Sequence, residues 1–459
     1  MKFLNLTGVS THFSWDSIFV YDYILLPLYI FILLFLTKII VDLYFKNSLE
    51  KKYIYPALYL KIAGGLFISM VYNYYYHGGD TLEYFIEGKI LSNIIIENPE
   101  ALFRVLFYNP KGGDAELDLM IKHLTYVLSP DTLIILKITA IINLFSFSSF
   151  LITTLFYSYI SFWCIWRFAT LLFRLYPNNK FEIILAFFYT PSLVVWGSGL
   201  LKDTVCFSCL CLLHYYLYTV FVFRKIKISY FIYIVIVGYL LVIIKIYVLL
   251  AYLPCFVFML SQQYKNKIRI IPIRVLVSPL IIIVGIITSY FLINKIGESN
   301  NRYSTNNFIE TATVQRNYLY SVSNKSNGSA YEMNLKDGSL FSYISNIPNA
   351  INVTLFRPYL WESKNVIMLL SSLESFFVLF ITLRLFYKQK YSLIFRKLYS
   401  DPNLQFFLIF SLFFSYFVGL TSSNFGSLVR YKIQSLPFYI LLILLLNYQH
   451  KKAKNIRSK

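Results

Sequence analysis

The sequence predicts an all-α integral membrane protein, a bundle of transmembrane helices that crosses the bilayer about eleven times. The first observation behind this prediction is the composition: 58% of the 459 residues are hydrophobic, only 14% are charged, and the mean hydropathy is +0.60. A soluble domain of this length carries more charge. The second observation is a series of long charge-free runs, and the third is the spacing of basic clusters between these runs.

The apolar runs are long enough to be membrane spans. Residues 140–166 and 404–429 contain no charge over the ~20 positions that a hydrocarbon core of ~30 Å requires. Runs 23–37 and 433–448 are shorter, and flanking lysines can extend them by snorkelling. Each run is expected to be helical, because lipid offers no partner for an unpaired backbone amide. The N-terminal segment lacks the pattern of a cleaved signal peptide, so the first helix is expected to remain.

The net charge of +20 is divided among short clusters and does not collect on one face. Nucleic acid is therefore not predicted as a partner. Basic clusters between apolar runs follow the positive-inside rule, which places them and the C-terminus in the cytoplasm and the N-terminus outside. The protein is expected in the cell (inner) membrane. The clusters are Lys46, Lys51 and Lys52; Arg174 and Lys180; Arg224, Lys225 and Lys227; Lys265, Lys267, Arg269 and Arg274; Arg384, Lys388, Lys390, Arg396 and Lys397; and the tail 451–459.

Placing every cluster in the cytoplasm fixes whether each intervening segment crosses the membrane an odd or an even number of times. Residues 230–260 are predicted to form a hairpin of two short helices that turns near Lys245. Residues 182–223 are predicted to turn at their Gly-Ser-Gly sequence. Residues 133–147 are predicted to form a re-entrant or interfacial helix before a true span at 150–173.

Two long loops then fall outside the membrane. Residues 73–131 are net acidic, and residues 294–364 are polar and nearly balanced in charge. The second loop is expected to cap the bundle and not to form a separate folded domain. Because no solenoid or heptad repeat is present, residues 1–459 are predicted to form one membrane domain.

Carboxylates early in the first outer loop are the candidate catalytic groups. Asp80, Glu83 and Glu87 share one side of a helix that is predicted to start at Thr81. A carboxylate at the membrane surface can act as a general base or hold a divalent cation, and no other cofactor is predicted. The alternative is that Asp80 is only the N-cap of this helix.

The cysteines do not predict a metal site. Cys206, Cys209, Cys211 and His214 have a metal-like spacing, but they do not fall on one face of a helix inside an apolar span. Thiols in apolar segments behave as small packing residues.

Five cationic residues from distant parts of the chain are the candidate ligand-binding groups. Lys202 follows the tip Gly197-Ser198-Gly199, where backbone N–H groups can hold a phosphate. Lys245 interrupts an apolar hairpin, where an ionisable group is costly without a partner. Arg357, within the aromatic segment 356–363, can bind a phosphate through two parallel hydrogen bonds.

Arg430 and Lys432 complete this set at the outer mouth of the last span, against the positive-inside trend. The alternative for Lys202 is a tight turn with a snorkelling side chain, and snorkelling to lipid headgroups is also the alternative for Arg357, Arg430 and Lys432. Together the five cations predict an anionic ligand at the outer interface, a lipid phosphate or diphosphate that arrives through the bilayer.

In these features the chain resembles the C-type bacterial membrane glycosyltransferases, which use polyprenyl-phosphate-linked sugars outside the cytoplasm. The resemblance lies in the multispan core, in Asp80 on an early outer loop, and in Arg430-Tyr431 leading to Pro437 in a late helix. It implies that Asp80, with Glu83 beside it, is the base that deprotonates the acceptor hydroxyl. It also implies that the cations stabilise the leaving lipid phosphate during synthesis of a cell-envelope polysaccharide.

Other functions are compatible with the same residues. Polysaccharide polymerases and O-antigen ligases are also multispan enzymes that hold lipid diphosphates. A flippase or transporter for a lipid-linked glycan would also place charge in a cavity, although the sequence shows no two related halves. A structural assembly component would tolerate removal of single charges. The sequence does not indicate the sugar, the acceptor or the oligomeric state.

Overall fold

A computed structural model describes residues 17–110, 112, 114–265, 321, 331, 333 and 340–457, with the backbone alone for 340, 341 and 448–457. The described residues form helices joined by turns, with no strand among them. Seven of these helices are long and apolar enough to cross a membrane, or eight if one bent pair counts as a single span. The predicted all-α class is confirmed, and the apolar helices indicate a multi-pass membrane protein. The number of about eleven crossings and their orientation stay predictions.

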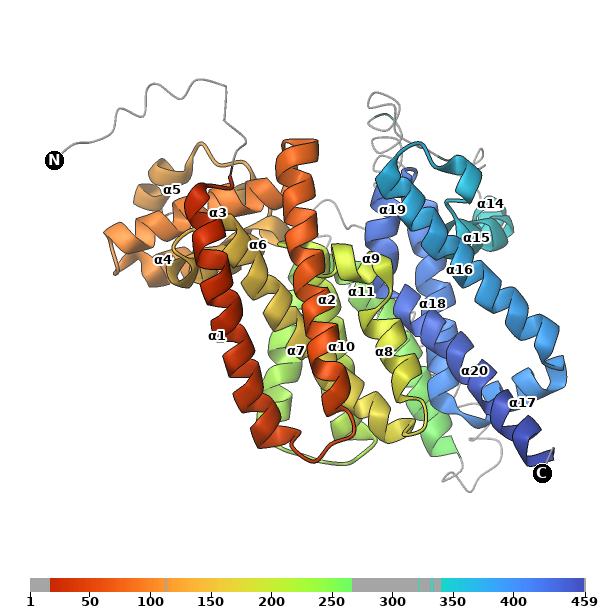
Figure 1. Ribbon diagram of the computed structural model, residues 1–459. Coiled ribbons are helices and arrows are strands. Elements are labelled where there is room, and N and C mark those ends of the chain that lie inside the picture. The colour runs from red at the N-terminus through yellow and green to blue at the C-terminus, as the bar shows by residue number, and fades with distance from the viewer. Residues whose placement is uncertain are drawn as a thin grey trace. The chain divides into compact units, whose positions relative to one another are not determined.

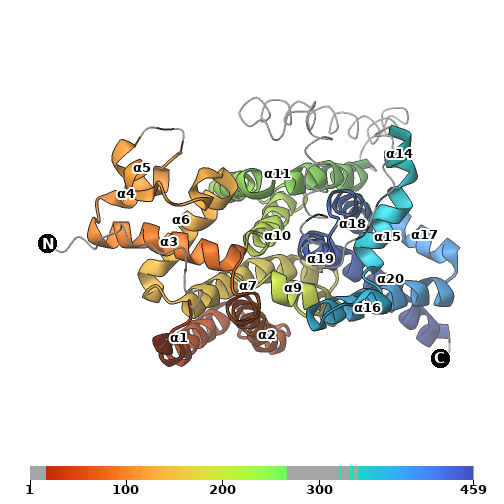
Figure 2. The ribbon, with the colours of Figure 1, turned by 90° about the horizontal axis from the view of Figure 1, so that it is seen from above.

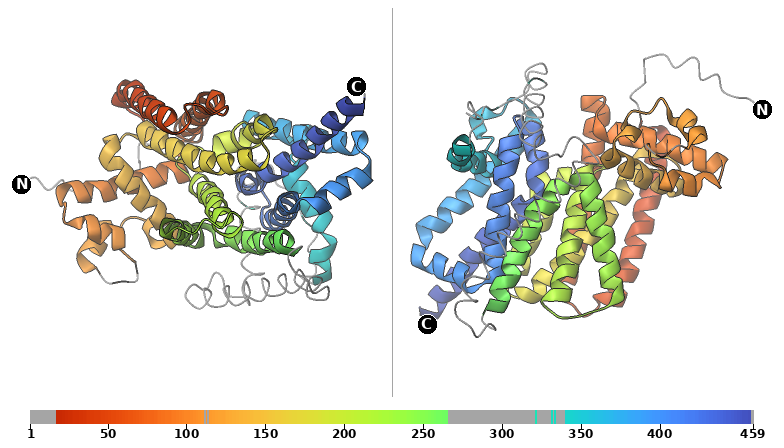
Figure 3. Two further views of the ribbon diagram at one scale, coloured as in Figure 1. Left: turned by 90° about the horizontal axis from the view of Figure 1, so that it is seen from below. Right: turned by 180° about the vertical axis from the view of Figure 1, so that it is seen from behind.

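The described chain divides into two compact units. Unit 1 comprises residues 1–162 and 195–205. Its helices are α1 (Val20–Tyr44), α2 (Lys51–Met70), the π-helix η2 (Val71–Tyr76), α3 (Asp80–Glu97), α4 (Ala101–Phe107), α5 (Ala115–Ile121), the 3-10 helix η3 (Tyr126–Leu128), α6 (Pro130–Ser146) and the first half of α7 (Phe150–Leu175). Helices α3 to α5 gather where α1 begins and α2 ends (Figures 1 and 3). The predicted outer loop 73–131 is therefore largely helical.

Unit 2 comprises residues 163–194 and 206–459. Besides the second half of α7 it contains α8 (Lys180–Phe188), most of α9 (Pro191–Trp196) and α10 (Lys202–Phe221), α11 (Ile228–Tyr264), α14 (Leu340–Ser345), α15 (Ile347–Phe356), η6 (Leu360–Glu362), α16 (Val366–Lys388), α17 (Tyr391–Ser400), α18 (Pro402–Thr421), α19 (Phe425–Tyr431), η7 (Lys432–Gln434) and α20 (Leu436–Arg457). Helix α18 packs between α11 and α15 (Figure 2) and buries Phe406, Phe410 and Phe414 completely.

The predicted hairpin is a reversal of α11 at Lys245. This residue has extended, non-helical dihedral angles, with φ at −152° and ψ at 76°. A straight helix of 37 residues would be about 55 Å long. Both ends of α11 nevertheless meet the C-terminal end of α10: the Tyr230 ring lies 5.6 Å from that of Tyr216, and the Tyr264 hydroxyl donates to the Phe221 carbonyl. The chain therefore turns back at the charged residue, as predicted.

Other predicted breaks also occur. The chain turns between α9 and α10 at the Gly-Ser-Gly tip, and the predicted helices 133–147 and 150–173 correspond to α6 and α7. The charge-free runs 140–166 and 404–429 are not single spans. Helix α6 ends at Ser146 before α7 starts, and α18 ends at Thr421. These helices end at uncharged polar turns of Ser, Thr and Asn. A charge-free run therefore does not show where a helix ends inside it.

The last predicted span is bent. The segments Phe425–Gln434 and Leu436–Asn447 meet at an angle of 62°. Of the predicted second outer loop, 294–364, the structure describes residues 321, 331, 333 and 340–364, which include α14, α15 and η6. The rest of that loop and the basic cluster from Lys267 to Arg274 lie outside the described residues.

Candidate functional site

The two predicted catalytic carboxylates lie in the first turn of α3. Gly79 is the N-cap, and its φ of 104° is rarely adopted by residues with a Cβ. A Cβ there would also come within 2.8 Å of the Tyr72 ring. The alternative role of Asp80 as N-cap is therefore wrong, because Asp80 is the first helical residue. Asp80 and Glu83 instead place negative charge at the positive end of the helix dipole.

Glu83 lies beside two other carboxylates. Partial burial raises its pKa, and the charges of Glu87 and Asp80 raise it further. Glu83 therefore titrates closer to neutral pH than an ordinary glutamate does. Glu87 is buried and accepts hydrogen bonds from the backbone N–H groups of Thr125 at 2.9 Å and Tyr126 at 3.1 Å. Glu87 thus anchors the chain before α6 to α3 and has a positioning role.

The tip between α9 and α10 is a buried, hydrogen-bonded turn. Gly199 has no space for a side chain, since a Cβ would lie 2.5 Å from Ile68 Cγ2. Three tip carbonyls accept hydrogen bonds from side chains of α2, α3 and α7; the donors are Lys61 to Gly197, Ser158 to Ser198 at 2.7 Å, and Thr81 to Leu200 at 2.6 Å. These bonds fix the direction in which the chain enters α10.

Lys202 begins α10 and forms an ion pair within unit 1. Its Nζ lies 2.5 Å from Oδ2 of Asp131, and its side chain is only 15% exposed. Burial raises the pKa of Asp131, but the charge and hydrogen bond of Lys202 outweigh burial and hold that pKa below its usual value. Lys202 therefore has a partner within the protein, because its ammonium meets a carboxylate of α6. A ligand phosphate at Lys202 would compete with Asp131.

The other four predicted cations lie in unit 2, around α19 and η7. We call them the cation cluster; its members are Lys245, Arg357, Arg430 and Lys432. Lys245 Nζ lies 4.7 Å from the centroid of the Tyr431 ring, and Arg357 Cζ lies 5.1 Å from that of Phe425. The remaining two cations are the sequence neighbours of Tyr431. The fold thus brings α11, the segment after α15, and α19 to one place, with aromatic rings at cation–π distance.

Lys432 is the most deeply buried member of the cluster, with no exposed surface. Its Nζ lies 3.3 Å from Oε1 of Glu374 on α16, at ion-pair distance without hydrogen-bond geometry, and donates to the Ser375 hydroxyl at 3.0 Å. The other Glu374 oxygen accepts from the backbone N–H of Ser192 at 2.5 Å. Snorkelling to headgroups is therefore wrong for Lys432, because its ammonium is enclosed by the bundle.

Arg357 is held by Glu362, which lies five residues later. Its Nε donates to both carboxylate oxygens of Glu362, at 3.0 and 3.1 Å, and its Nη2 donates to one of them. The Ser375 hydroxyl also donates to the Arg357 carbonyl at 3.0 Å. The donors that would bind a phosphate in parallel thus already bind a carboxylate.

The sequence analysis found the cations but missed two of their partners. In the sequence, Asp131 is only the last residue of the predicted outer loop 73–131, and nothing there indicates that it pairs with Lys202. Glu374 could have been predicted, because it is the one charged residue between Val366 and Thr382 in an apolar helix. An ionisable residue at that position is expected to have a partner inside the bundle.

The structure places Asp80, Glu83 and Lys202 in unit 1 and the cation cluster in unit 2. Within the described residues, no group of three or more His, Cys, Asp and Glu side chains could hold a metal ion. Comparisons with protein-family models, with curated proteins and with solved structures found no match.

Proposed function

We propose that the protein is a membrane glycosyltransferase that moves a sugar from a polyprenyl-phosphate or polyprenyl-diphosphate carrier to an acceptor on the outer side of the membrane. The observation that carries this proposal is the gathering of four cations, Lys245, Arg357, Arg430 and Lys432, around one short segment of an apolar bundle. Placing cations inside an apolar bundle is costly, so it is expected to serve a function. An anionic headgroup on an apolar chain matches this combination of charge and surroundings.

The reaction assigned to these residues breaks the bond between the anomeric carbon and the phosphate oxygen and forms a bond from that carbon to the acceptor hydroxyl oxygen. The hydroxyl proton passes to Asp80, and the electron pair of the broken bond leaves on the lipid phosphate. Within unit 2, the cation cluster would hold a charged lipid phosphate. Ionised Glu83, one helical turn away, would add negative charge beside the transferred proton.

A transfer assay tests the proposal. The purified protein, reconstituted in liposomes with a radiolabelled polyprenyl-phosphate sugar, is expected to release the lipid phosphate and label an added glycan acceptor. The product is measured together with the movement of labelled lipid between leaflets. Label movement without sugar transfer would contradict the proposal and support a flippase.

The flippase or transporter is the second candidate because the structure has broken helices. Helix α11 reverses at Lys245, and the α19 to α20 segment bends by 62° next to Lys432. Discontinuous membrane helices often form substrate sites in transporters. The ion pair of Lys432 with Glu374 is also of a kind that ion-coupled carriers contain.

The pH dependence of transfer provides a separate prediction for Glu83. Its raised pKa means that it takes up a proton before an ordinary glutamate does as pH falls. Protonated Glu83 no longer places negative charge beside the transferred proton, so the transfer rate should decline as pH falls, beginning at a higher pH than an ordinary glutamate would give. In Glu83→Gln the rate should be lower and flat over that pH range.

The matched control is Glu97→Gln, which removes an exposed carboxylate at the other end of α3. It should keep the wild-type pH profile. An unchanged decline in Glu83→Gln would exclude Glu83 from the reaction.

A further inference from the structure

Helix α17 (Tyr391–Ser400) has an apolar side that protein covers only in part. Ile394 is buried, whereas Tyr391, Phe395 and Tyr399, spaced four residues apart, are 63%, 68% and 79% exposed. A helix of ten residues is about 15 Å long and cannot cross a bilayer. Candidate spans flank α17 on both sides, because α16 ends at Lys388 and α18 starts at Pro402. Helix α17 therefore has the form of an interfacial helix.

Cations border this apolar side. Arg396 and Lys397 follow Phe395 on α17, and Lys388 and Lys390 precede the helix. Within the described part of the chain, none of the four forms an ion pair with a carboxylate. Partial burial lowers the pKa of Lys397, and a phosphate nearby would raise that pKa again.

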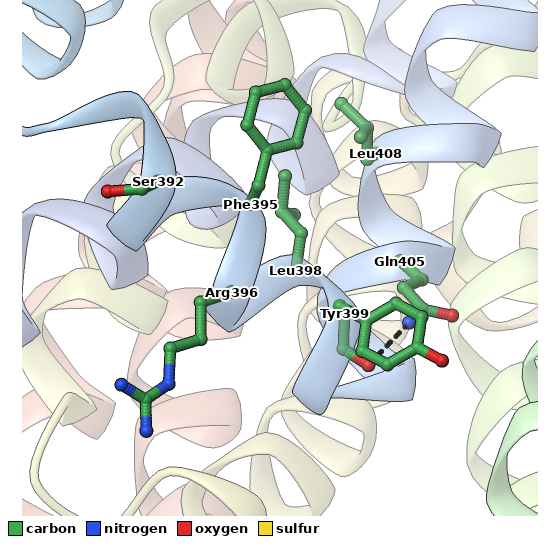
Figure 4. Close-up of a pocket in the computed structure, with 7 residues that line it drawn as sticks. All are labelled: Ser392, Phe395, Arg396, Leu398, Tyr399, Gln405 and Leu408. Carbon is green, nitrogen blue, oxygen red and sulfur yellow. Dashed lines mark hydrogen bonds between the residues drawn. The ribbon is translucent and has the colours of Figure 1, made fainter.

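A hollow lies between α17 and the first turns of α18. Its lining is mostly apolar, from Phe395, Leu398 and Tyr399 on α17 and Leu408 on α18. Figure 4 shows the Phe395 ring and the Leu408 side chain extending to one side, while the Arg396 guanidinium extends to the other. The hollow is thus apolar, and the Arg396 guanidinium extends from its edge.

We propose that this hollow binds an anionic phospholipid from the surrounding leaflet. One acyl chain would lie against Phe395, Leu398 and Leu408, and the headgroup phosphate would lie beside Arg396 and Lys397. The charge matches because guanidinium and ammonium groups both attract phosphate. The polarity matches because a phospholipid has its charge at one end. This site lies wholly within unit 2 and does not depend on the proposed enzymatic activity.

Native mass spectrometry tests the site. The full-length protein is mixed in detergent with phosphatidylglycerol or with phosphatidylcholine of the same acyl chains, and the lipid that stays bound after the detergent is removed is measured. Wild type is expected to retain phosphatidylglycerol in preference to phosphatidylcholine. The double variant Arg396→Gln, Lys397→Gln should bind phosphatidylglycerol roughly 25-fold more weakly, since each cation near an anionic headgroup contributes about fivefold.

The matched control is Lys51→Gln, Lys52→Gln, which removes two cations at the start of α2. It should retain phosphatidylglycerol as wild type does, and thermal melting should show all variants folded. A second variant, Leu408→Gln, should weaken the binding of both lipids, because it adds a polar group to the apolar lining of the hollow. Equal retention of the two lipids by wild type, equal loss in the control, or displacement by millimolar inorganic phosphate would overturn the proposal.

Discussion

Replacing Asp80 with Asn should reduce the rate of sugar transfer by about 10²-fold to 10⁴-fold, the usual contribution of a general base. The amide has nearly the same shape but cannot take the acceptor proton. Because Gly79 and not Asp80 is the N-cap, the substitution should leave α3 in place. The measurement is transfer under saturating donor, alongside donor binding and thermal stability.

Donor binding and stability should stay near wild type in Asp80→Asn, which separates a chemical role from a structural one. Glu97→Gln removes a carboxylate from the same helix and should transfer sugar normally. Transfer within about threefold of wild type in Asp80→Asn would remove Asp80 from the proposed mechanism, since a general base contributes far more than that.

Replacing Glu374 with Gln should lower the free energy of unfolding by about 3 to 5 kcal/mol, because it leaves the ammonium of fully buried Lys432 without its charged partner. Two well-packed apolar residues of similar size can replace a buried pair at little cost. The double variant Glu374→Leu, Lys432→Met should therefore recover most of the loss. Thermal and denaturant unfolding in detergent measure both.

An exposed pair provides the control for this cycle. Asp42 and Lys51 lie 3.5 Å apart with side chains 49% and 42% exposed, so Asp42→Asn should cost less than about 1 kcal/mol. If Glu374→Gln costs no more than Asp42→Asn, the two buried groups do not interact as a charged pair.

Much of the helical order follows from the sequence, because lipid-compatible segments need long apolar runs and charge interrupts them. The reversal of α11 at Lys245 is the clearest case, since a charged residue divides an apolar stretch too long for one span. The break between α6 and α7 and the end of α18 at Thr421 are harder to predict from the sequence. Polar but uncharged turns close these helices, and a count of charges does not detect them.

The pairing of the cations could not be predicted in the same way. Positive charge is visible in sequence, but the partner of Lys432 comes from α16, and the partner of Lys202 comes from α6. These contacts depend on tertiary packing. The pairing changes the expectation for Arg357 and Lys432, because both meet carboxylates inside the protein.

The central claim is that the cation cluster binds a lipid phosphate, and the most direct test is equilibrium binding of a radiolabelled polyprenyl diphosphate to the purified protein. Lys245→Met and Arg430→Met should each weaken binding about tenfold or more, as loss of a charge-assisted hydrogen bond does. Lys225→Gln, an exposed cation of unit 2, should bind as wild type does. Equal affinity in all four proteins would contradict the account.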